Sequence, residues 1–216
     1  MEEGFLMELL KKTAQNLEKN NYKTYIVNSK EEVYGIVKSL VNKDSVIGFG
    51  GSESLKETAV LDLLEKDGYT LLDRRKEGAD IPKIYRDAFS ADFYLCSSNA
   101  ITEDGLLYNV DGNANRVAAL MFGPENVIVV AGVNKIVKNI DEAVKRVKEY
   151  VAPKNCVRLG LDTYCAKTGR CIALDSEEKF TGCDSPKRIC CDYVISGRQR
   201  IKDRVKVILV NEELGY

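Results

Sequence analysis

The chain contains no histidine among its 216 residues. Without an imidazole, neither a Ser-His nor a Cys-His catalytic pair can form. Any metal ion would have to be held by thiolate, carboxylate, amide or backbone oxygen ligands. These limits remove a large class of hydrolytic mechanisms before any motif is considered.

Membrane and export signals are also missing from the sequence. No apolar run approaches the roughly 18 residues of a membrane-spanning helix, and the opening Met-Glu-Glu-Gly is not the basic stretch of a signal peptide. The formal net charge of −1 gives no electrostatic case for nucleic acid or acidic membranes. We therefore expect a cytoplasmic protein that binds neither, while assembly into a homo-oligomer stays open.

Apolar patterns typical of strands alternate along the chain with patterns typical of helices. This alternation predicts an α/β fold with a mostly parallel sheet, whose ligands bind beyond the carboxyl ends of the strands. Residues 106–110 are expected to form one arm of a hairpin that turns at Asp111-Gly112. The other predicted strands are 25–27, 45–47, 69–72, 93–97, 127–131 and 205–210, and the predicted helices begin near residues 5, 29, 54, 84 and 139.

The chain is predicted to divide at Pro153, after which regular patterning is lost. Residues 1–152 are expected to form the α/β core. Residues 153–204 are expected to form an irregular, cysteine-rich extension. Residues 205–216 are expected to return to the core sheet as its final strand.

A glycine-rich loop, Gly48–Ser52, follows the second predicted strand. Glycine lets the backbone approach a ligand, and the helix that follows directs free N–H groups towards the loop. The loop lacks the Gly-Lys-Ser/Thr ending of a P-loop, and Glu53 stands where a dinucleotide fingerprint needs its third glycine. Asp73 ends the next predicted strand, about where a dinucleotide site places the acidic residue that meets the ribose, so dinucleotide binding remains a weak possibility. The structural alternative is a strand-to-helix turn that binds no ligand. We expect an anionic ligand to contact Gly50, Gly51, Ser52 and Ser54.

Residues 97–116 form an unusually polar segment after a predicted strand. Carboxylates there could act as general base or nucleophile, and cations could bind a substrate carboxylate or phosphate. The alternative is that these residues form hairpin turns and helix caps. The catalytic candidates are Asp104, Asp111 and Lys135, and the further ligand-binding candidates are Asn99, Thr102, Asn115, Arg116 and Asn134.

Six of the seven cysteines lie within residues 156–191. In a cytosolic protein such a group indicates a metal or redox site before it indicates disulfides. Zinc or an iron–sulfur cluster is the predicted cofactor. Redox-active thiols and plain structural cysteines remain alternatives, because the chain has no Cys-x-x-Cys pair. The predicted metal ligands are Cys165, Cys171, Cys183 and Cys190.

Several linked motifs resemble the LUD domain, the domain of the lactate-utilisation protein family, in its branch with a cysteine-bearing C-terminal segment. They are Ser98-Asn-Ala-Ile-Thr102, Asp104-Gly105, Asp111-Gly112, Asn115-Arg-Val-Ala118, Gly123-Pro124, Gly132-Val-Asn-Lys-Ile-Val137 and Gly182–Cys190.

This resemblance implies a fold like that of the NagB/RpiA/CoA-transferase group. It also implies a subunit of, or accessory to, an L-lactate or hydroxy-acid oxidation system, which binds a small anionic metabolite and works with iron–sulfur oxidoreductase subunits. CoA transferases carry a glutamate nucleophile where this chain has Ser97-Ser98-Asn99, so a covalent acyl-CoA mechanism is not expected. The alternatives are a free-standing isomerase or transferase acting on a phosphorylated sugar or acyl-CoA, and a non-catalytic redox sensor or scaffold.

Overall fold

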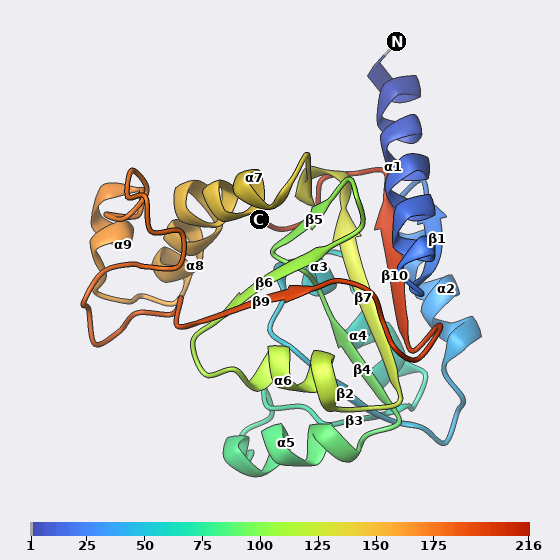
Figure 1. Cartoon of the computed structure of the whole chain (residues 1–216). Coiled ribbons are helices and arrows are strands. Elements are labelled where there is room, and N and C mark those ends of the chain that lie inside the picture. The colour runs from blue at the N-terminus through green and yellow to red at the C-terminus, as the bar shows by residue number, and fades with distance from the viewer. Residues whose placement is uncertain (1) are drawn as a thin grey trace.

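A computed structural model describes residues 2–216, without the side chains of Glu2 and Glu3. Its centre is a six-stranded sheet in which all paired neighbours run parallel (Figure 1). The predicted α/β fold with a mostly parallel sheet is therefore confirmed. In spatial order the strands are β1 (Lys23–Val27), β10 (Val205–Val210), β7 (Asn126–Gly132), β4 (Phe93–Cys96), β2 (Val46–Phe49) and β3 (Thr70–Leu71).

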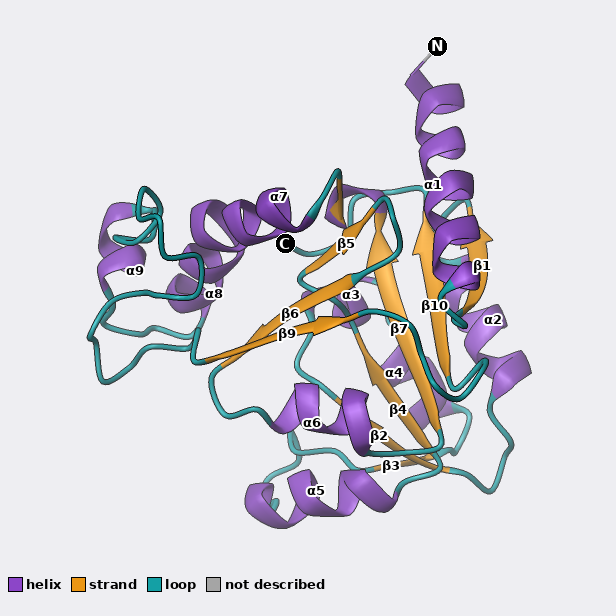
Figure 2. Ribbon diagram, viewed as in Figure 1, coloured by secondary structure: helices purple, strands orange, loops and turns teal. Residues whose placement is uncertain are grey.

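Helices cover both faces of this sheet because successive strand residues point to opposite sides. In β7, Val127 and Val129 belong to one buried cluster, whereas Ile128 and Val130 belong to the other. The first cluster includes residues of α1 (Glu2–Lys19) and α6 (Asn115–Phe122). The second includes residues of α2 (Glu32–Leu40), α3 (Glu53–Glu57) and α4 (Val60–Lys66), while α5 (Ile81–Asp87) lies towards the β3 side of the molecule (Figure 2).

A second sheet of four strands lies beside the first, in the order β8 (Ile136–Val137), β5 (Ala100–Thr102), β6 (Leu107–Asp111) and β9 (Asp192–Ser196). A third buried cluster joins this sheet to a helical run behind it. That run consists of α7 (Ile140–Arg146), a π-helical turn (Val147–Val151) and α8 (Ala152–Arg158), and α9 (Tyr164–Thr168) follows.

The structure differs from the sequence predictions in the segment after β6. The hairpin turn lies between β5 and β6, at Glu103–Gly105, and not at Asp111-Gly112. After Asp111 the chain enters α6, a helix that was not predicted. The helix has only eight residues, and its buried apolar residues Val117, Ala119 and Leu120 give too short a pattern to recognise.

The segment 153–204 is also more regular than expected. Pro153 does not end the helical structure, because it lies in the first turn of α8, where proline is tolerated. Farther on, β9 pairs along the whole of β6, so this part of the segment belongs to the second sheet. Val205–Val210 lies within the main sheet, between β1 and β7. In the described part of the chain, every helix is too short or too polar to cross a membrane.

The β5–β6 turn is held against α1. The side-chain amides of Asn16 and Asn20 donate to the backbone oxygens of Glu103 and Gly105, at 2.8 Å and 3.0 Å. Gly105 has φ +89°, and a Cβ atom there would lie 2.6 Å from the carbonyl carbon of Asn16. This turn therefore needs glycine for its backbone conformation and also for the close approach of the helix.

We predict that Gly105→Ala destabilises the protein more than Gly68→Ala. Both glycines have positive φ, but a Cβ at Gly68 meets nothing closer than the Lys43 Nζ at 3.8 Å. Gly68→Ala should cost about 1 kcal/mol of unfolding free energy from backbone strain alone. Gly105→Ala should lose a further 1–3 kcal/mol, roughly the cost of overpacking. Urea denaturation of the two variants measures this difference. Equal losses of unfolding free energy would show that α1 can move away from the added Cβ at no cost.

Candidate functional site

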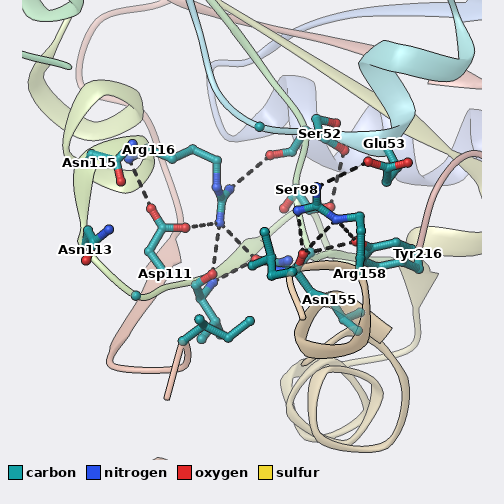
Figure 3. A pocket seen from close by; sticks show the side chains of 18 of the residues that line it. Ser52, Glu53, Ser98, Asp111, Asn113, Asn115, Arg116, Asn155, Arg158 and Tyr216 are labelled. Atoms are coloured by element: carbon teal, nitrogen blue, oxygen red, sulfur yellow. Dashed lines mark hydrogen bonds and ion pairs between the residues drawn. The ribbon is translucent and has the colours of Figure 1, made fainter. Parts of the chain in front are cut away.

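A cleft of about 330 Å³ opens at the carboxyl ends of β2, β4 and β7. These three strands are neighbours in the main sheet, so the segments that follow them meet at one edge. Gly51 and Ser52 come after β2, Ser97 to Asn99 after β4, and Lys135 after β7. The other walls are the β6–α6 connection, the end of α8 and the C-terminal Tyr216 (Figure 3).

The buried guanidinium of Arg116 organises one wall of this cleft. Its Nη1 donates to the Ser97 carbonyl oxygen at 3.1 Å and to the Asn109 side-chain oxygen. Its Nη2 donates to the Asn99 side-chain oxygen at 3.0 Å and pairs with the Asp111 carboxylate at 2.5 Å. A single side chain thus joins the ends of β4 and β6 to the loop between β4 and β5.

The Asp111 carboxylate is fully engaged as well. Its second oxygen accepts the backbone N–H groups of Arg116 and Val117, at 3.1 Å and 3.0 Å, and so caps the start of α6 (Figure 3). A carboxylate at this end also interacts favourably with the helix dipole. A Cβ at Gly50 would lie 3.1 Å from the Arg116 Cδ, which explains the glycine beside this side chain. Arg116 and Asp111 therefore line the cleft with their charges satisfied within the protein.

Lys135 presents a different arrangement. It is only 3% exposed, and its Nζ donates to the Ser97 hydroxyl at 3.1 Å. Ser97 in turn lies 3.5 Å from the Ser54 hydroxyl, which donates to the Leu214 carbonyl oxygen at 3.2 Å. Burial, together with the nearby charges of Arg146 and Arg116, lowers the pKa of Lys135 to about 7. This amine therefore titrates near neutral pH within the cleft.

Two further arginines line the cleft, and neither was predicted from the sequence. Arg74 follows β3, stacks on the Tyr85 ring at 5.5 Å and donates to its hydroxyl at 3.2 Å. Arg158, at the end of α8, lies 3.6 Å from the Glu53 carboxylate and donates to the Tyr216 hydroxyl at 2.6 Å (Figure 3). Neither residue lies in a recognisable motif, so only the fold reveals that they share a site.

The structure brings most, but not all, of the predicted site residues into this cleft. The predicted residues that line it are Gly51, Ser52, Asn99, Asp111, Asn115, Arg116 and Lys135.

The other predicted residues lie behind the lining or away from it. Ser54 is buried beneath Ser97. Asn134 binds the C-terminal segment, since it accepts from the Leu214 N–H at 3.1 Å and donates to the Gly215 carbonyl oxygen at 3.2 Å. Thr102 and Asp104 bond to each other in the β5–β6 turn, and Gly50 lies beneath Arg116.

The four predicted metal ligands line one small cavity, next to the rings of Tyr108 and Tyr193. A fifth cysteine, Cys156, has its Sγ 3.7 Å from that of Cys165. Within residues 2–216, however, no three His, Cys, Asp or Glu side chains are grouped so that they could hold a metal ion. Zinc or an iron–sulfur cluster at these thiols therefore stays a prediction. The four cysteines that line the cavity are Cys165, Cys171, Cys183 and Cys190.

The fold and site together define an α/β protein with a cation-lined, strand-end cleft. The LUD domain family model matches residues 10–210, so this chain belongs to the LUD domain family. A DUF162 family protein from Deinococcus radiodurans has a similar structure, with 17% identity over 95% of this chain and 98% of that chain and a TM-score of 0.52. That likeness shows a shared fold.

Ribose 5-phosphate isomerase A from Methanocaldococcus jannaschii is a more distant structural match. Its identity is 14% over 81% of this chain and 80% of that chain, with a TM-score of 0.36. No curated protein matches the sequence.

We predict that Arg116→Met is much more destabilising than Arg204→Met. Both arginines donate to backbone carbonyls. Among the described residues, however, the partners of Arg204 are the carbonyls of Ala119, Leu120 and Pro124 and include no carboxylate. Removing Arg116 leaves the buried Asp111 carboxylate without its cationic partner, which should cost about 3–5 kcal/mol of unfolding free energy. Arg204→Met should cost about 1–3 kcal/mol. Chemical denaturation tests this difference. Similar losses of unfolding free energy in the two variants would mean that the Arg116–Asp111 ion pair contributes little to stability.

We also predict that Lys135→Met is more stable than the wild type at pH 7, by a margin that narrows at higher pH. The unfolded chain keeps this lysine protonated up to a pKa of about 10.4, whereas the folded protein releases the proton near pH 7. Between these values the unfolded state binds more protons, so wild-type stability rises with pH. The margin should shrink by about 1.4 kcal/mol per pH unit. Urea denaturation at pH 7 to 10 measures it, and a margin independent of pH would contradict the depressed pKa.

Proposed function

We propose that this chain is a lactate-utilisation-type protein whose strand-end cleft binds a small hydroxy- or oxo-carboxylate. In this role it serves as a subunit of, or accessory to, a hydroxy-acid oxidation system. Membership of the LUD domain family supports the metabolic setting. The observation that carries the choice of ligand is that two cations in the cleft have no carboxylate partner among the residues that the structure describes.

Four cationic side chains line the cleft, and they differ in whether a carboxylate pairs with them. Arg116 is matched by Asp111 and Arg158 by Glu53. Among the described residues, the Lys135 Nζ bonds only to Ser97, and the Arg74 guanidinium bonds only to Tyr85. When Lys135 is protonated, the cleft therefore carries an uncompensated positive charge that a ligand anion can neutralise.

The remaining lining suits a small polar ligand. The side-chain hydroxyl of Ser52 and the side-chain amides of Asn113 and Asn115 also line the cleft (Figure 3). Such groups can pair with the hydroxyl or carbonyl of a short acid. A cleft of about 330 Å³ lies at the lower end of the size range of ligand sites, so a three-carbon acid fits with bridging water. Arg74 also covers Gly51, where a Cβ would collide with its guanidinium, so the glycine loop lets this cation approach.

We predict that L-lactate and pyruvate raise the melting temperature, because a ligand that binds only the native state stabilises it. Lactamide, which has no charge, should have no effect. Arg74→Ala should weaken lactate binding by about tenfold or more, the size expected for a charge-assisted hydrogen bond. Lactate binding should also weaken as pH rises through 7, because the ammonium of Lys135 loses its proton there. Differential scanning fluorimetry and titration calorimetry measure these effects.

The matched control for this series is Arg86→Ala. Arg86 lies on α5 and is exposed, and in the described part of the chain it donates only to the Pro82 carbonyl oxygen, outside the cleft. It should leave lactate binding unchanged. A melting temperature raised by ribose 5-phosphate or coenzyme A, but not by lactate or pyruvate, would replace this proposal with an enzyme of phosphorylated sugars or acyl-CoA. Equal losses for Arg74→Ala and Arg86→Ala would place the ligand elsewhere.

A further inference from the structure

We propose that the Lys135 amine forms a Schiff base with the carbonyl carbon of a small 2-oxo acid bound in the cleft. This inference rests on the proposed function, since it requires that the cleft binds a short carboxylate. It goes further by assigning a covalent step to one atom, Nζ, and by restricting the reactive ligands to those that carry a carbonyl group.

The position of Lys135 supplies the geometric basis. It ends a 3-10 turn (Val133–Lys135) that follows directly on β7, so its backbone is fixed by the central sheet. The side chain is buried, yet it lines the cleft together with its partner Ser97. Among the described residues no carboxylate forms an ion pair with Nζ, which bonds only to the Ser97 hydroxyl at 3.1 Å. In the described part of the chain, this nitrogen therefore has no directly paired carboxylate to hold it as an ammonium ion.

Two neighbouring arginines oppose protonation of the amine. Arg146 is fixed on α7, where it donates to the Asn99 carbonyl oxygen at 2.7 Å and to the Asn134 carbonyl oxygen at 3.2 Å. Arg116 is fixed by the network described above. Both positive charges act with burial to lower the pKa of Lys135, and the charge of Glu57 opposes them only weakly. Desolvation beside another cation is a recognised way to keep a lysine nucleophilic near neutral pH.

The reaction needs no oxidant, reductant or further reactant. The Nζ lone pair forms a bond to the carbonyl carbon, the carbonyl π electrons move to oxygen, and a proton passes from nitrogen to that oxygen to give a carbinolamine. This intermediate then expels its hydroxyl group as water, taking up one proton, and leaves a protonated C=N bond. Ser97, within hydrogen-bond reach of Nζ, is positioned to relay the proton. The unpaired Arg74 is the candidate partner for the carboxylate of the acid.

Lys148 provides an internal comparison within the same chain. It is also buried, but it lies outside this cleft, and its Nζ donates to the Ala173 and Glu178 carbonyl oxygens at 2.8 Å and 3.3 Å. Those acceptors engage its N–H groups in a structural role. Burial alone therefore does not distinguish Lys135. Its place on the cleft wall does, together with the single hydroxyl acceptor that its Nζ has among the described residues.

The test is reductive trapping of the full-length protein with pyruvate and sodium cyanoborohydride, followed by intact mass spectrometry and peptide mapping. The expected result is one adduct per chain on Lys135, with the Lys148 peptide unmodified. L-Lactate, which has no carbonyl, should give no adduct, and Lys135→Arg should abolish trapping. The trapped fraction should rise between pH 6 and pH 8, the opposite trend to lactate affinity, because the neutral amine reacts and the ammonium binds.

The outcomes separate this inference from the function on which it rests. Pyruvate that raises the melting temperature but leaves no adduct on Lys135 would overturn the Schiff base and leave carboxylate binding intact. No thermal shift with lactate or pyruvate, and no adduct, would overturn both. Labelling spread over surface lysines, unchanged in Lys135→Arg, would also overturn the Schiff base. Because the wild-type peptide map decides the site, the test does not depend on the folding of any variant.

Discussion

The buried guanidinium of Arg116 is the interaction on which the arrangement of this cleft depends. A charge placed out of water must be compensated, and this one is surrounded by carbonyl, amide and carboxylate oxygens from β4, β6 and the loop after β4. Because these acceptors come from two different sheets, satisfying one side chain sets the spacing between the sheets. The Asp111 carboxylate extends the same network into the first turn of α6.

The chemistry assigned to the cleft follows from a contrast between cations in the same space. Arg116 and Arg158 have acidic partners, whereas Arg74 and Lys135 have none in the described part of the chain. The paired Arg116 fixes one wall of the cleft. For Lys135, desolvation and the positive charges of Arg146 and Arg116 bring its pKa close to neutrality. Its place at the end of a central strand keeps the amine fixed where a ligand would enter.

Part of this site could be recognised from the sequence. The polar residues after predicted strands pointed to Asn99, Arg116 and Lys135, because ligands of α/β proteins gather at strand ends. The same reasoning could not distinguish a reactive group from a structural one. Asp111 was a candidate base, yet it caps a helix that was not predicted, and Asp104 lies in a turn beside Thr102. Arg74, Arg158 and Tyr216 carry no local pattern at all.

By itself, the sequence determined the alternation of strands and helices and the family, because apolar periodicity and short motifs are local properties that survive without knowledge of contacts. Only the tertiary structure decided which charges meet. β4 and β7 are neighbours although β5, β6 and α6 separate them along the chain, and this adjacency alone brings the Lys135 amine to Ser97. Burial and pairing, which set the protonation state of a side chain, depend on atoms distant in sequence, so no linear pattern records them.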